Sequence, residues 1–531
     1  MFRFLLALLA CGYAIGGAAQ LTAPRTDTPA AAAAATITAD DLRAHLSIIA
    51  GDAMEGRETG TEGQRKAAAY IAAQFAELGL PAFLDGGYEQ RIAYISEGWD
   101  KIELFVGKER FRHAWDYYSF PSVNSDLGTI DTKKVRFLGY GIDDPAYSDY
   151  AGQDVQDQVI LVYGGEPTRA DGKSYLSNGD TPSEWSTNWR KKLEAAYKAG
   201  AKAVFIIDPE LKQNIAANRR KLLSSAMRIG EGEQPETKYA NSVFISSKVA
   251  EAMLGKRFQK VVAARDRIKA TGKPQRKPVK LKSKVQLTQQ KDVNTLIGSN
   301  VLGYLEGRDP QLKDEVVVVS AHYDHLGKKG ESIYNGADDN GSGSSTVLEI
   351  AEAFVRAKEA GQGPRRSILF LLVSGEEKGL LGSAYYAENP VFPLEKTIAD
   401  VNVDMVGRVD EAHADNPYYI YVIGSNRLST ELHEINETAN TDYAQLDLDY
   451  TYNAEDDPNR YYYRSDHYNF AERGIPSIFY FSGVHADYHQ PTDTVDKINF
   501  EKMVRIGQLV FHTTWELANR DKTIEVDVTT P

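Results

Sequence analysis

Four stretches in the C-terminal half of the chain are apolar for the full length of a strand. Runs of this kind are typical of strands buried on both faces of a sheet. Between the first two, residues 342–360 carry apolar side chains at helical spacing. This alternation predicts an α/β fold, with a central mixed, mostly parallel sheet sandwiched by helices. The four stretches are "EVVVVSAHYD" (315–324), "SILFLLVSGEE" (367–377), "IADVNVDMVG" (398–407) and "IPSIFYFSG" (475–483).

The N-terminal half has a different pattern. Residues 38–50 open with a capping signature and continue as an amphipathic helix, and residues 60–80 predict a second helix that Gly79 and Pro81 stop. A middle segment then alternates short strands with a helix. Its predicted elements are the strands 135–142, 157–165 and 201–210 and the helix 188–200.

Two segments are predicted to be linkers. "TPAAAAAATI" (28–37) is a low-complexity run of alanine. Residues 255–284 are strongly basic with scattered prolines, which favours a solvated helix followed by a linker back to the main domain over a surface for an anionic partner. The predicted domain plan is therefore a leader over 1–19, a linker over 20–37, a main domain over 38–120 and 285–531, and an insertion over 121–284.

The length of the chain indicates more than one domain, and its net charge argues against one class of function. The 531 residues are enough for two sizeable cores. The net charge of −13 argues against a nucleic-acid partner, because such partners select basic surfaces. No residue points to a protein partner or sets the oligomeric state.

The N-terminus predicts export. Arg3, an apolar core and Ala18-Ala19 form a secretory signal peptide, and the apolar part is too short to be favoured as a membrane span. The single cysteine, Cys11, lies inside this segment, where a lipid anchor is the less favoured alternative. Cleavage after Ala19 would leave no cysteine, which fits a periplasmic or secreted protein that needs no disulfide and excludes a cysteine nucleophile.

The predicted strands end in polar residues that suit a metal site. His322 and Asp324 end the first, Glu376 and Glu377 the second, and Asp404 the third. Ligands bind in the crevice outside the carboxyl ends of strands in open α/β sheets. Histidines with several carboxylates and no cysteine suit zinc held by nitrogen and oxygen. Two loops rich in the same residue types, 335–345 and 485–494, add further donors.

The chain resembles a known family in the order of its sequence blocks. That family is the co-catalytic di-zinc exopeptidases related to aminopeptidase Y and glutamate carboxypeptidase II. The middle segment resembles the protease-associated domain that some members carry as an insertion. The matching blocks are "DAMEGRETGTEGQRKAAAYI", "SAHYDHLG", "NGADDNGSGSSTVLEIAEAF", "LLVSGEEKGLLGS", "NVDMVGR", "SDHYNFAERGIPSIFYF" and "DYHQPTDT".

The resemblance implies a ligand set for two zinc ions. His322 and Asp404 would hold one ion, Glu377 and His489 the other, and Asp339, chosen over Asp338 by its spacing to Gly-Ser-Gly, would bridge both.

The resemblance also implies a mechanism. Glu376 would be the general base for a metal-activated water, Asp324 would orient His322, and Tyr488 would hydrogen-bond the tetrahedral intermediate. The implied protein is a secreted zinc aminopeptidase that acts on peptides.

Three other functions remain open at this stage. A carboxypeptidase or dipeptidase would share the fold, a glutaminyl cyclase would need one zinc, and a receptor-like homologue would lack activity. The complete ligand set, Asp339 included, argues against the last two.

Several other candidates are weaker. "SDHYNF" places Ser465, Asp466 and His467 in a row, but catalytic triads are assembled from distant positions. His325 and His485 are expected to be solvent-exposed loop histidines. Residues 446–464, rich in acids and aromatics, would line the substrate pocket, bind calcium or form a surface excursion.

Overall fold

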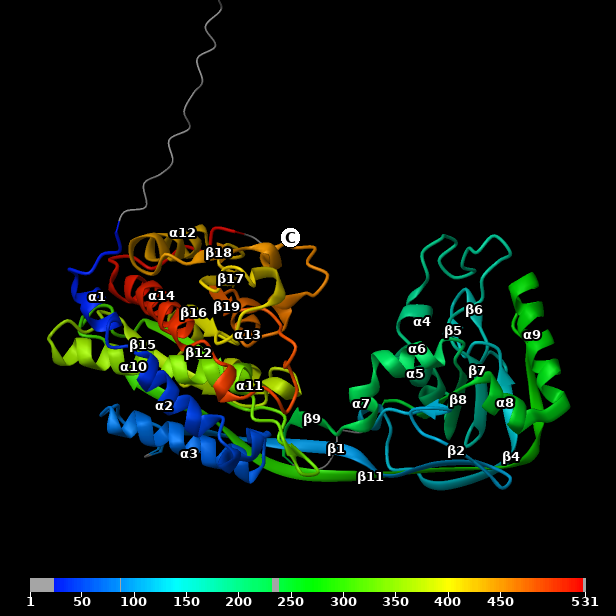
Figure 1. Cartoon of the computed structure of the whole chain (residues 1–531). Helices are drawn as coiled ribbons and strands as arrows, with labels where there is room; N and C mark the ends of the chain where they lie inside the picture. The colour runs from blue at the N-terminus through cyan, green and yellow to red at the C-terminus, as the bar shows by residue number, and fades with distance from the viewer. Residues whose placement is uncertain (1–22, 86, 232–237, 529–531) are drawn as a thin grey trace, which may run out of the picture. The chain divides into compact units, whose positions relative to one another are not determined.

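The computed structural model describes residues 23–85, 87–231 and 238–528 and divides the chain into two compact units (Figure 1). One unit combines the chain up to Arg91 with Gly298–Pro531, and the other is Ile92–Ile297. The predicted signal peptide and Cys11 lie outside the described residues. Within the described part, no helix has both the length and the apolar character needed to cross a membrane.

The first unit is built on a mixed, mostly parallel sheet, as predicted. The strand order is β18-β17-β19-β16-β12-β15-β11, with only the C-terminal part of β11 belonging to this unit. The β17–β19 and β11–β15 pairs are antiparallel, and the other pairs are parallel. The strands are β11 (Arg276–Leu305), β12 (Val316–His322), β15 (Ser367–Val373), β16 (Thr397–Val403), β17 (Tyr419–Ile423), β18 (Asp447–Asp449) and β19 (Ser477–Phe481).

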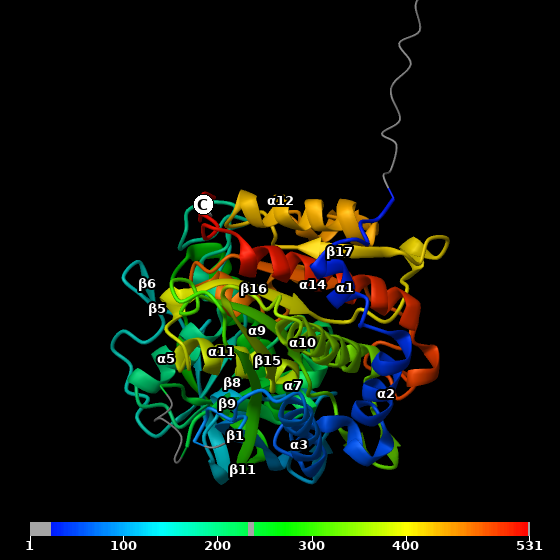
Figure 2. The same ribbon diagram turned by 90° about the vertical axis from the view of Figure 1, so that its left-hand side faces the viewer.

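Helices cover both faces of this sheet, which explains why its strands are apolar throughout. Side chains alternate along β12, so that Val317 and Val319 pack with α10 and α14, while Val316 and Val318 pack with Tyr386 of α11 and Phe470 of α13. Figure 2 shows α10 and α14 running together in one layer. The helices of this unit are α1 (Pro29–Ala34), α2 (Ala39–Ile49), α3 (Glu62–Glu77), α10 (Gly343–Glu359), α11 (Leu381–Glu388), α12 (Thr430–Ala439), α13 (Tyr468–Ala471) and α14 (Phe500–Asn519).

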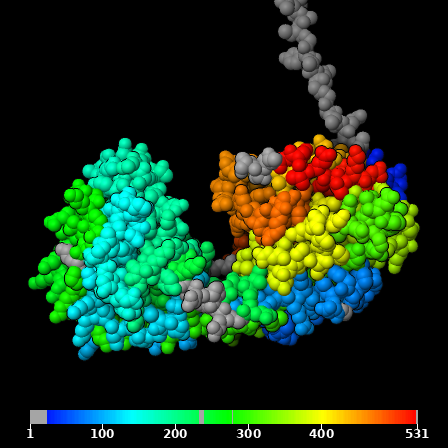
Figure 3. All heavy atoms as spheres, turned by 180° about the vertical axis from the view of Figure 1, so that it is seen from behind, coloured from blue at the N-terminus to red at the C-terminus, as the bar shows by residue number. Residues whose placement is uncertain are grey.

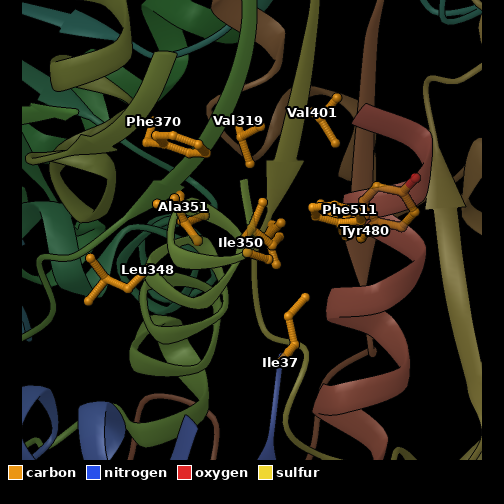
Figure 4. Close-up of a cluster of buried hydrophobic side chains, with 14 of the residues drawn as sticks. Ile37, Val319, Leu348, Ile350, Ala351, Phe370, Val401, Tyr480 and Phe511 are labelled. Carbon is orange, nitrogen blue, oxygen red and sulfur yellow. The ribbon is translucent and has the colours of Figure 1, made fainter. Parts of the chain in front are cut away.

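The main core lies between the sheet and the layer that contains α10 and α14. Figure 4 shows Val319 and Val401 of the sheet facing Ile350 and Phe511 of the two helices. All four side chains are fully buried. This packing fixes the central strands, and thereby the positions of the residues at their ends.

The second unit, coloured mainly cyan to green in Figure 3, contains the remaining strands of the same 15-stranded sheet. The N-terminal part of β11 pairs with β4, followed in order by β7, β8, β10 and β3. Its identity as a protease-associated domain stays a prediction. The strands are β1 (Glu89–Val106), β2 (Glu109–Phe111), β3 (Tyr117–Tyr118), β4 (Gly128–Leu138), β7 (Val159–Tyr163), β8 (Ala203–Ile207), β9 (Ala226–Ile229) and β10 (Asn241–Ile245), with the two-residue pair β5 (Asp143–Asp144) and β6 (Tyr147–Ser148).

The helices of the second unit are short. Among them, α5 occupies the helix predicted over 188–200, and α9 lies in the basic segment. They are α4 (Glu184–Thr187), α5 (Arg190–Lys198), α6 (Leu211–Ala217), α7 (Arg219–Leu223), α8 (Ser247–Leu254) and α9 (Phe258–Thr271).

The second unit is wider than the insertion predicted over 121–284. The chain divides at Arg91/Ile92 and Ile297/Gly298 instead, within β1 and β11. Most of each strand falls in the second unit, where β1 pairs with β2 and the N-terminal part of β11 pairs with β4. The predicted basic linker is also wrong after α9. Residues 276–289 form a strand that pairs with β4, since Val279, Leu281, Val285 and Leu287 bury one face of it.

The alanine run predicted as a linker is a helix. Thr28 caps α1 by accepting a hydrogen bond from the Ala31 amide, and Ala30, Ala33 and Ala34 are buried in the main core, where α1 contacts α10 and α14. The alanine-rich composition suggested a linker, but alanine is also the side chain that lets helices pack closely. The run therefore forms a helix at this contact.

Replacing a buried alanine of α1 with a charged residue should destabilise the first unit. Ala34 is 2% exposed, so Ala34→Glu would bury an unpaired carboxylate. We expect a loss of about 2 kcal/mol or more in the free energy of unfolding, measured by thermal or urea denaturation. Ala32→Glu, on the exposed side of the same helix, is the matched control and should unfold like the parent. Equal stability of the two variants would contradict the helix placement.

Candidate active site

Three parallel strands bring their polar ends to one edge of the sheet. β12 lies between β15 and β16 and is parallel to both. His322 is the last residue of β12, and Asp404 directly follows β16. After β15, Gly375 adopts a left-handed conformation with φ 75°, which turns the chain so that Glu376 and Glu377 begin a helical turn at the same edge.

Two loops complete the group. Asp339 lies in the bend that leads into α10, and His489 comes from the loop after β19. Asp493 fastens the first loop to the second, because its carboxylate accepts hydrogen bonds from the amides of Asp338 (3.0 Å) and Asp339 (3.2 Å). His489 itself has φ 58°, an uncommon conformation for a residue other than glycine.

The first cluster of donors surrounds His322. Its Nε2 atom lies 3.3 Å from Oδ1 of Asp404 and 3.4 Å from Oδ1 of Asp339. Oε2 of Glu376 is farther away, at 3.9 Å. His322, Asp404 and Glu376 offer donor atoms close enough together to hold a metal ion.

The second cluster surrounds Glu377. Nε2 of His489 lies 3.1 Å from Oε1 of Glu377 and 3.0 Å from Oδ2 of Asp339. The two oxygens of Asp339 therefore face different histidines, Oδ1 toward His322 and Oδ2 toward His489. A carboxylate placed in this way is suited to bridge two ions. All five residues predicted as ligands thus lie together.

The neighbouring Asp338 is turned away from both clusters. Its Oδ1 accepts a hydrogen bond from the Gly407 amide at 2.6 Å, and its Oδ2 lies 3.2 Å from Nε2 of His485. The geometry therefore agrees with the choice of Asp339 over Asp338.

Two histidines expected in exposed loops are buried. His325 is fully buried, and its Nδ1 lies 3.0 Å from Oε1 of Glu377 and 3.7 Å from Oδ2 of Asp339. The side chain of His485 is 4% exposed and pairs with Asp338. The expectation was wrong because the segment after β12 is held inside the unit, where the His325 amide donates to the Arg57 carbonyl. The only signal in the sequence was the position of His325 directly after the strand-end Asp324.

Buried hydrogen bonds orient the candidate ligands. Asp324 accepts from the Thr59 hydroxyl at 2.7 Å and from the Glu376 amide at 3.2 Å, while its main-chain oxygen lies 3.1 Å from Nδ1 of His322. The His322 ring is therefore fixed by the Asp324 main chain, whereas its carboxylate is 3.8 Å away. On the other side, the Ser465 hydroxyl donates to Oδ2 of Asp404 at 2.7 Å. Partners of this kind set the orientation of a metal-binding side chain.

Arg57 is a further residue that the sequence pattern did not single out. It is fully buried and donates to the main-chain oxygens of Ile49, Tyr323, Asn335 and Gly336. Burial lowers the pKa of Arg57 to about 10, so the guanidinium stays charged at neutral pH near the carboxylates of the site. It ties the N-terminal segment to the two loops that carry Asp339 and His325.

The carboxylates of the site differ in their pKa. Burial raises the pKa of Glu376 well above its usual range, and the charges of Glu377 and Asp404 add to this, against an opposing effect of His322. Burial also raises the pKa of Glu377, but the approach of His325 and His489 outweighs it and leaves the pKa below its usual range. The pKa values of the two adjacent glutamates are thus shifted in opposite directions by their surroundings.

A pocket opens beside the clusters. Tyr488 stacks on His489 with ring centroids 3.8 Å apart, and burial holds the pKa of its hydroxyl well above the ordinary value. Tyr461 and Arg464 reach this pocket, so residues 446–464 contribute to its wall. The pocket is lined by Asp339, Glu376, Asp404, Met405, Tyr461, Arg464, Phe479, Phe481, Val484 and Tyr488.

The row Ser465-Asp466-His467 does not form a triad. Ser465 donates to Asp404, and Asp466 accepts from the Ser383 hydroxyl at 2.5 Å. His467 stacks on Phe479 with centroids 4.9 Å apart, and burial lowers its pKa to about 3. Its role is packing, and Ser465 acts by orienting Asp404.

The donor set fits two divalent metal ions. Buried carboxylates with oxygens within 4.8 Å of one another, as in the pairs Glu376–Asp404 and Asp339–Glu377, are costly without a cation. Imidazole nitrogens and carboxylate oxygens without sulfur suit zinc. Asp339, with an oxygen in each cluster, connects the two candidate positions.

Fold and donor set together define the class: an α/β protein with the ligands of a two-metal centre at the carboxyl edge of its sheet. Residues 300–514 match the model of peptidase family M28. The fold is also that of a solved structure, the aminopeptidase from Aneurinibacillus sp. strain AM-1. The TM-score is 0.56 at 18% identity, over 94% of this chain and 97% of the other.

Two curated relatives also match part of the chain. A probable leucine aminopeptidase of Arthroderma otae is 33% identical over 216 residues, which are 39% of this chain and 56% of that protein. Aminopeptidase YwaD of Bacillus subtilis is 28% identical over 250 residues, 44% of this chain and 50% of that protein. The chain thus spans about half the length of the curated relatives it matches.

Removing the hydroxyl of Ser465 should weaken metal binding. Ser465→Ala leaves Oδ2 of Asp404 without its 2.7 Å donor. We expect zinc affinity to fall about 10–100-fold, measured by competition with a chromogenic chelator. Ser477→Ala is the control, because Ser477 is also a buried serine but donates to the main-chain oxygen of Ile475. A similar affinity in both variants would show that Ser465 does not orient Asp404.

Proposed function

We propose that this protein is a zinc-dependent aminopeptidase that removes N-terminal residues from peptides. The position of Asp339 carries the proposal, because its two oxygens face two separate histidine clusters 3.4 and 3.0 Å away. The match of residues 300–514 to the model of peptidase family M28 supports a peptide as substrate. The predicted signal peptide supports export to the periplasm or the exterior.

The ligands divide between two ions. His322 and Asp404 would hold the first, Glu377 and His489 the second, and Asp339 both. When bound, the ions supply Lewis acidity, which polarises a carbonyl and lowers the pKa of water.

Glu376 is the proposed general base. Its carboxylate is the donor farthest from His322, at 3.9 Å, and it lines the pocket, so it stays free to take a proton from water and pass it to the leaving amine. A raised pKa makes the Glu376 carboxylate a stronger base toward water, and it lets the side chain hold the proton until the amine leaves.

Tyr488 and Asp324 have supporting roles. The Tyr488 side chain lines the pocket beside Glu376, and its hydroxyl stays protonated because burial raises its pKa. It is therefore placed to donate a hydrogen bond to the developing oxyanion. Asp324 orients His322 through its main-chain oxygen and holds the Glu376 amide through its carboxylate.

The pocket favours an apolar N-terminal side chain. Met405, Phe479, Phe481 and Val484 supply most of its apolar wall. The name of the Arthroderma otae relative, a probable leucine aminopeptidase, agrees with a substrate of this kind. The carboxylates beside the pocket would attract a free terminal amine.

The remaining functions make different predictions about metal and substrate. A carboxypeptidase would need a free substrate carboxyl group, a glutaminyl cyclase would bind one zinc, and a receptor-like homologue would not cleave peptides. The arrangement of five ligands in two clusters favours the hydrolase with two ions.

Replacing the proposed base should separate catalysis from metal binding. Glu376→Gln keeps the shape of the side chain but cannot accept a proton, so we expect kcat for an aminoacyl chromogenic substrate to fall about 10²–10⁴-fold. Zinc content, measured by elemental analysis, should stay at the wild-type level, because the ligands proposed for both ions remain.

The exposed residue Glu395 provides a matched control. Glu395→Gln should retain the parent turnover, whereas near-parental turnover of Glu376→Gln would refute the assignment of the base.

Blocking the substrate's N-terminus should prevent cleavage. We expect leucyl chromogenic substrates to be hydrolysed and their N-acetylated forms to be resistant, because acetylation removes the ammonium group that the carboxylates attract. Peptides with a free and an amidated C-terminus should be cleaved alike. Equal rates on free and acetylated substrates would exclude an aminopeptidase, and activity that survives exhaustive chelation would exclude a metal mechanism.

A further inference from the structure

His325 occupies a position that neither of the two predicted ligand pairs uses. Its ring is fully buried, and Nδ1 faces the second cluster, 3.0 Å from Oε1 of Glu377 and 3.7 Å from Oδ2 of Asp339. Those are the two oxygens that His489 also approaches, at 3.1 and 3.0 Å. The rings of His325 and His489 lie with centroids 5.7 Å apart, inclined at 66°.

The surroundings of His325 hold its ring in this orientation. A Cβ atom on Gly336 would lie 2.5 Å from two carbons of the ring, so the imidazole packs directly on glycine backbone. On the other side, its main-chain amide donates to Arg57. The ring therefore has little freedom to turn away from Glu377 and Asp339.

The polar atoms of His325 are otherwise unsatisfied. Among the described residues, neither ring nitrogen makes a hydrogen bond of good geometry, although both are inaccessible to solvent. A buried imidazole without such a bond is costly. Coordination of a cation through Nδ1 would satisfy the nitrogen that faces the carboxylates, since either ring nitrogen can be a ligand.

We propose that His325 is a further protein ligand of the second metal ion, in addition to Asp339, Glu377 and His489. The inference rests on the proposed two-zinc site and adds one imidazole to it. The second ion would then have four protein donors, and a fifth position is open to zinc when it expands its coordination. The first ion would keep three of its own, His322, Asp404 and the shared Asp339.

This difference in donors makes the two ions unequal. The second ion is held by two imidazoles and the first by one, so the first should be the more easily removed. Graded chelation of the wild-type protein should therefore give a stable form with one zinc. The zinc that remains in that form should be the ion held by Asp339, Glu377, His489 and His325.

Zinc absorption spectroscopy can count the imidazoles. In the wild-type protein loaded with two zinc ions, extended X-ray absorption should show three imidazoles shared by the two ions. His325→Ala, reconstituted at saturating zinc, should show two. Its zinc affinity in chelator competition should fall about 10-fold or more, because removing even an outer partner of a ligand costs that much.

His485→Ala is the matched control. His485 is a buried histidine of the same site, but it faces Asp338, which is turned away from both clusters. Its removal should leave three imidazoles. His325→Asn adds a second comparison, since an amide can hydrogen-bond Glu377 but is a poor zinc ligand, and it should also show two.

The outcomes are separable. An unchanged imidazole count in His325→Ala would overturn the proposal and leave His325 as a residue that only orients Glu377. In that case, two bound zinc ions and wild-type hydrolysis would leave the proposed function intact. Failure of the wild-type protein to bind zinc at all would overturn the proposed function as well.

Discussion

The site depends on the confinement of several carboxylates to one buried edge of a sheet. Asp339, Glu377 and Asp404 lie within reach of the same few histidine nitrogens, and little of any of their side chains is exposed. Such a group is stable only where positive charge balances it. Arg57 supplies part of that balance from the protein itself, and the arrangement of the histidine and carboxylate donor atoms suits metal ions for the remainder.

The residues of the site come from separate strands and loops, which together hold the carboxylates at this edge of the sheet. The three central strands deliver His322, Asp404 and the two glutamates, while two loops deliver Asp339 and His489. Asp493 ties the loops together, and Arg57 joins the N-terminal segment to them. The ligands are therefore fixed by hydrogen bonds from parts of the chain far apart in sequence, which is what a site with precise metal geometry requires.

The environment also separates two adjacent glutamates into two roles. Glu376 and Glu377 follow the same strand. Burial raises the pKa of Glu376 above its usual value, whereas the approach of two histidines lowers the pKa of Glu377. The proposed general base and a proposed metal ligand would thus stand next to each other in the chain. Their difference comes from what surrounds them, since the side chains are identical.

The sequence by itself determined the central strands, α10 and the site residues at the strand ends, because long apolar runs and the polar residues that end them are local features. The choice of Asp339 over Asp338 came from the family resemblance and stays a prediction. The sequence did not reveal that the alanine run is α1, that residues 276–289 form a strand, or that His325 is buried against Glu377. Those outcomes depend on which surfaces meet: alanines fit where helices approach closely, a basic strand is stable where a partner strand accepts its apolar face, and a loop histidine is buried where glycine backbone makes room for its ring. Only the tertiary structure brings such surfaces together.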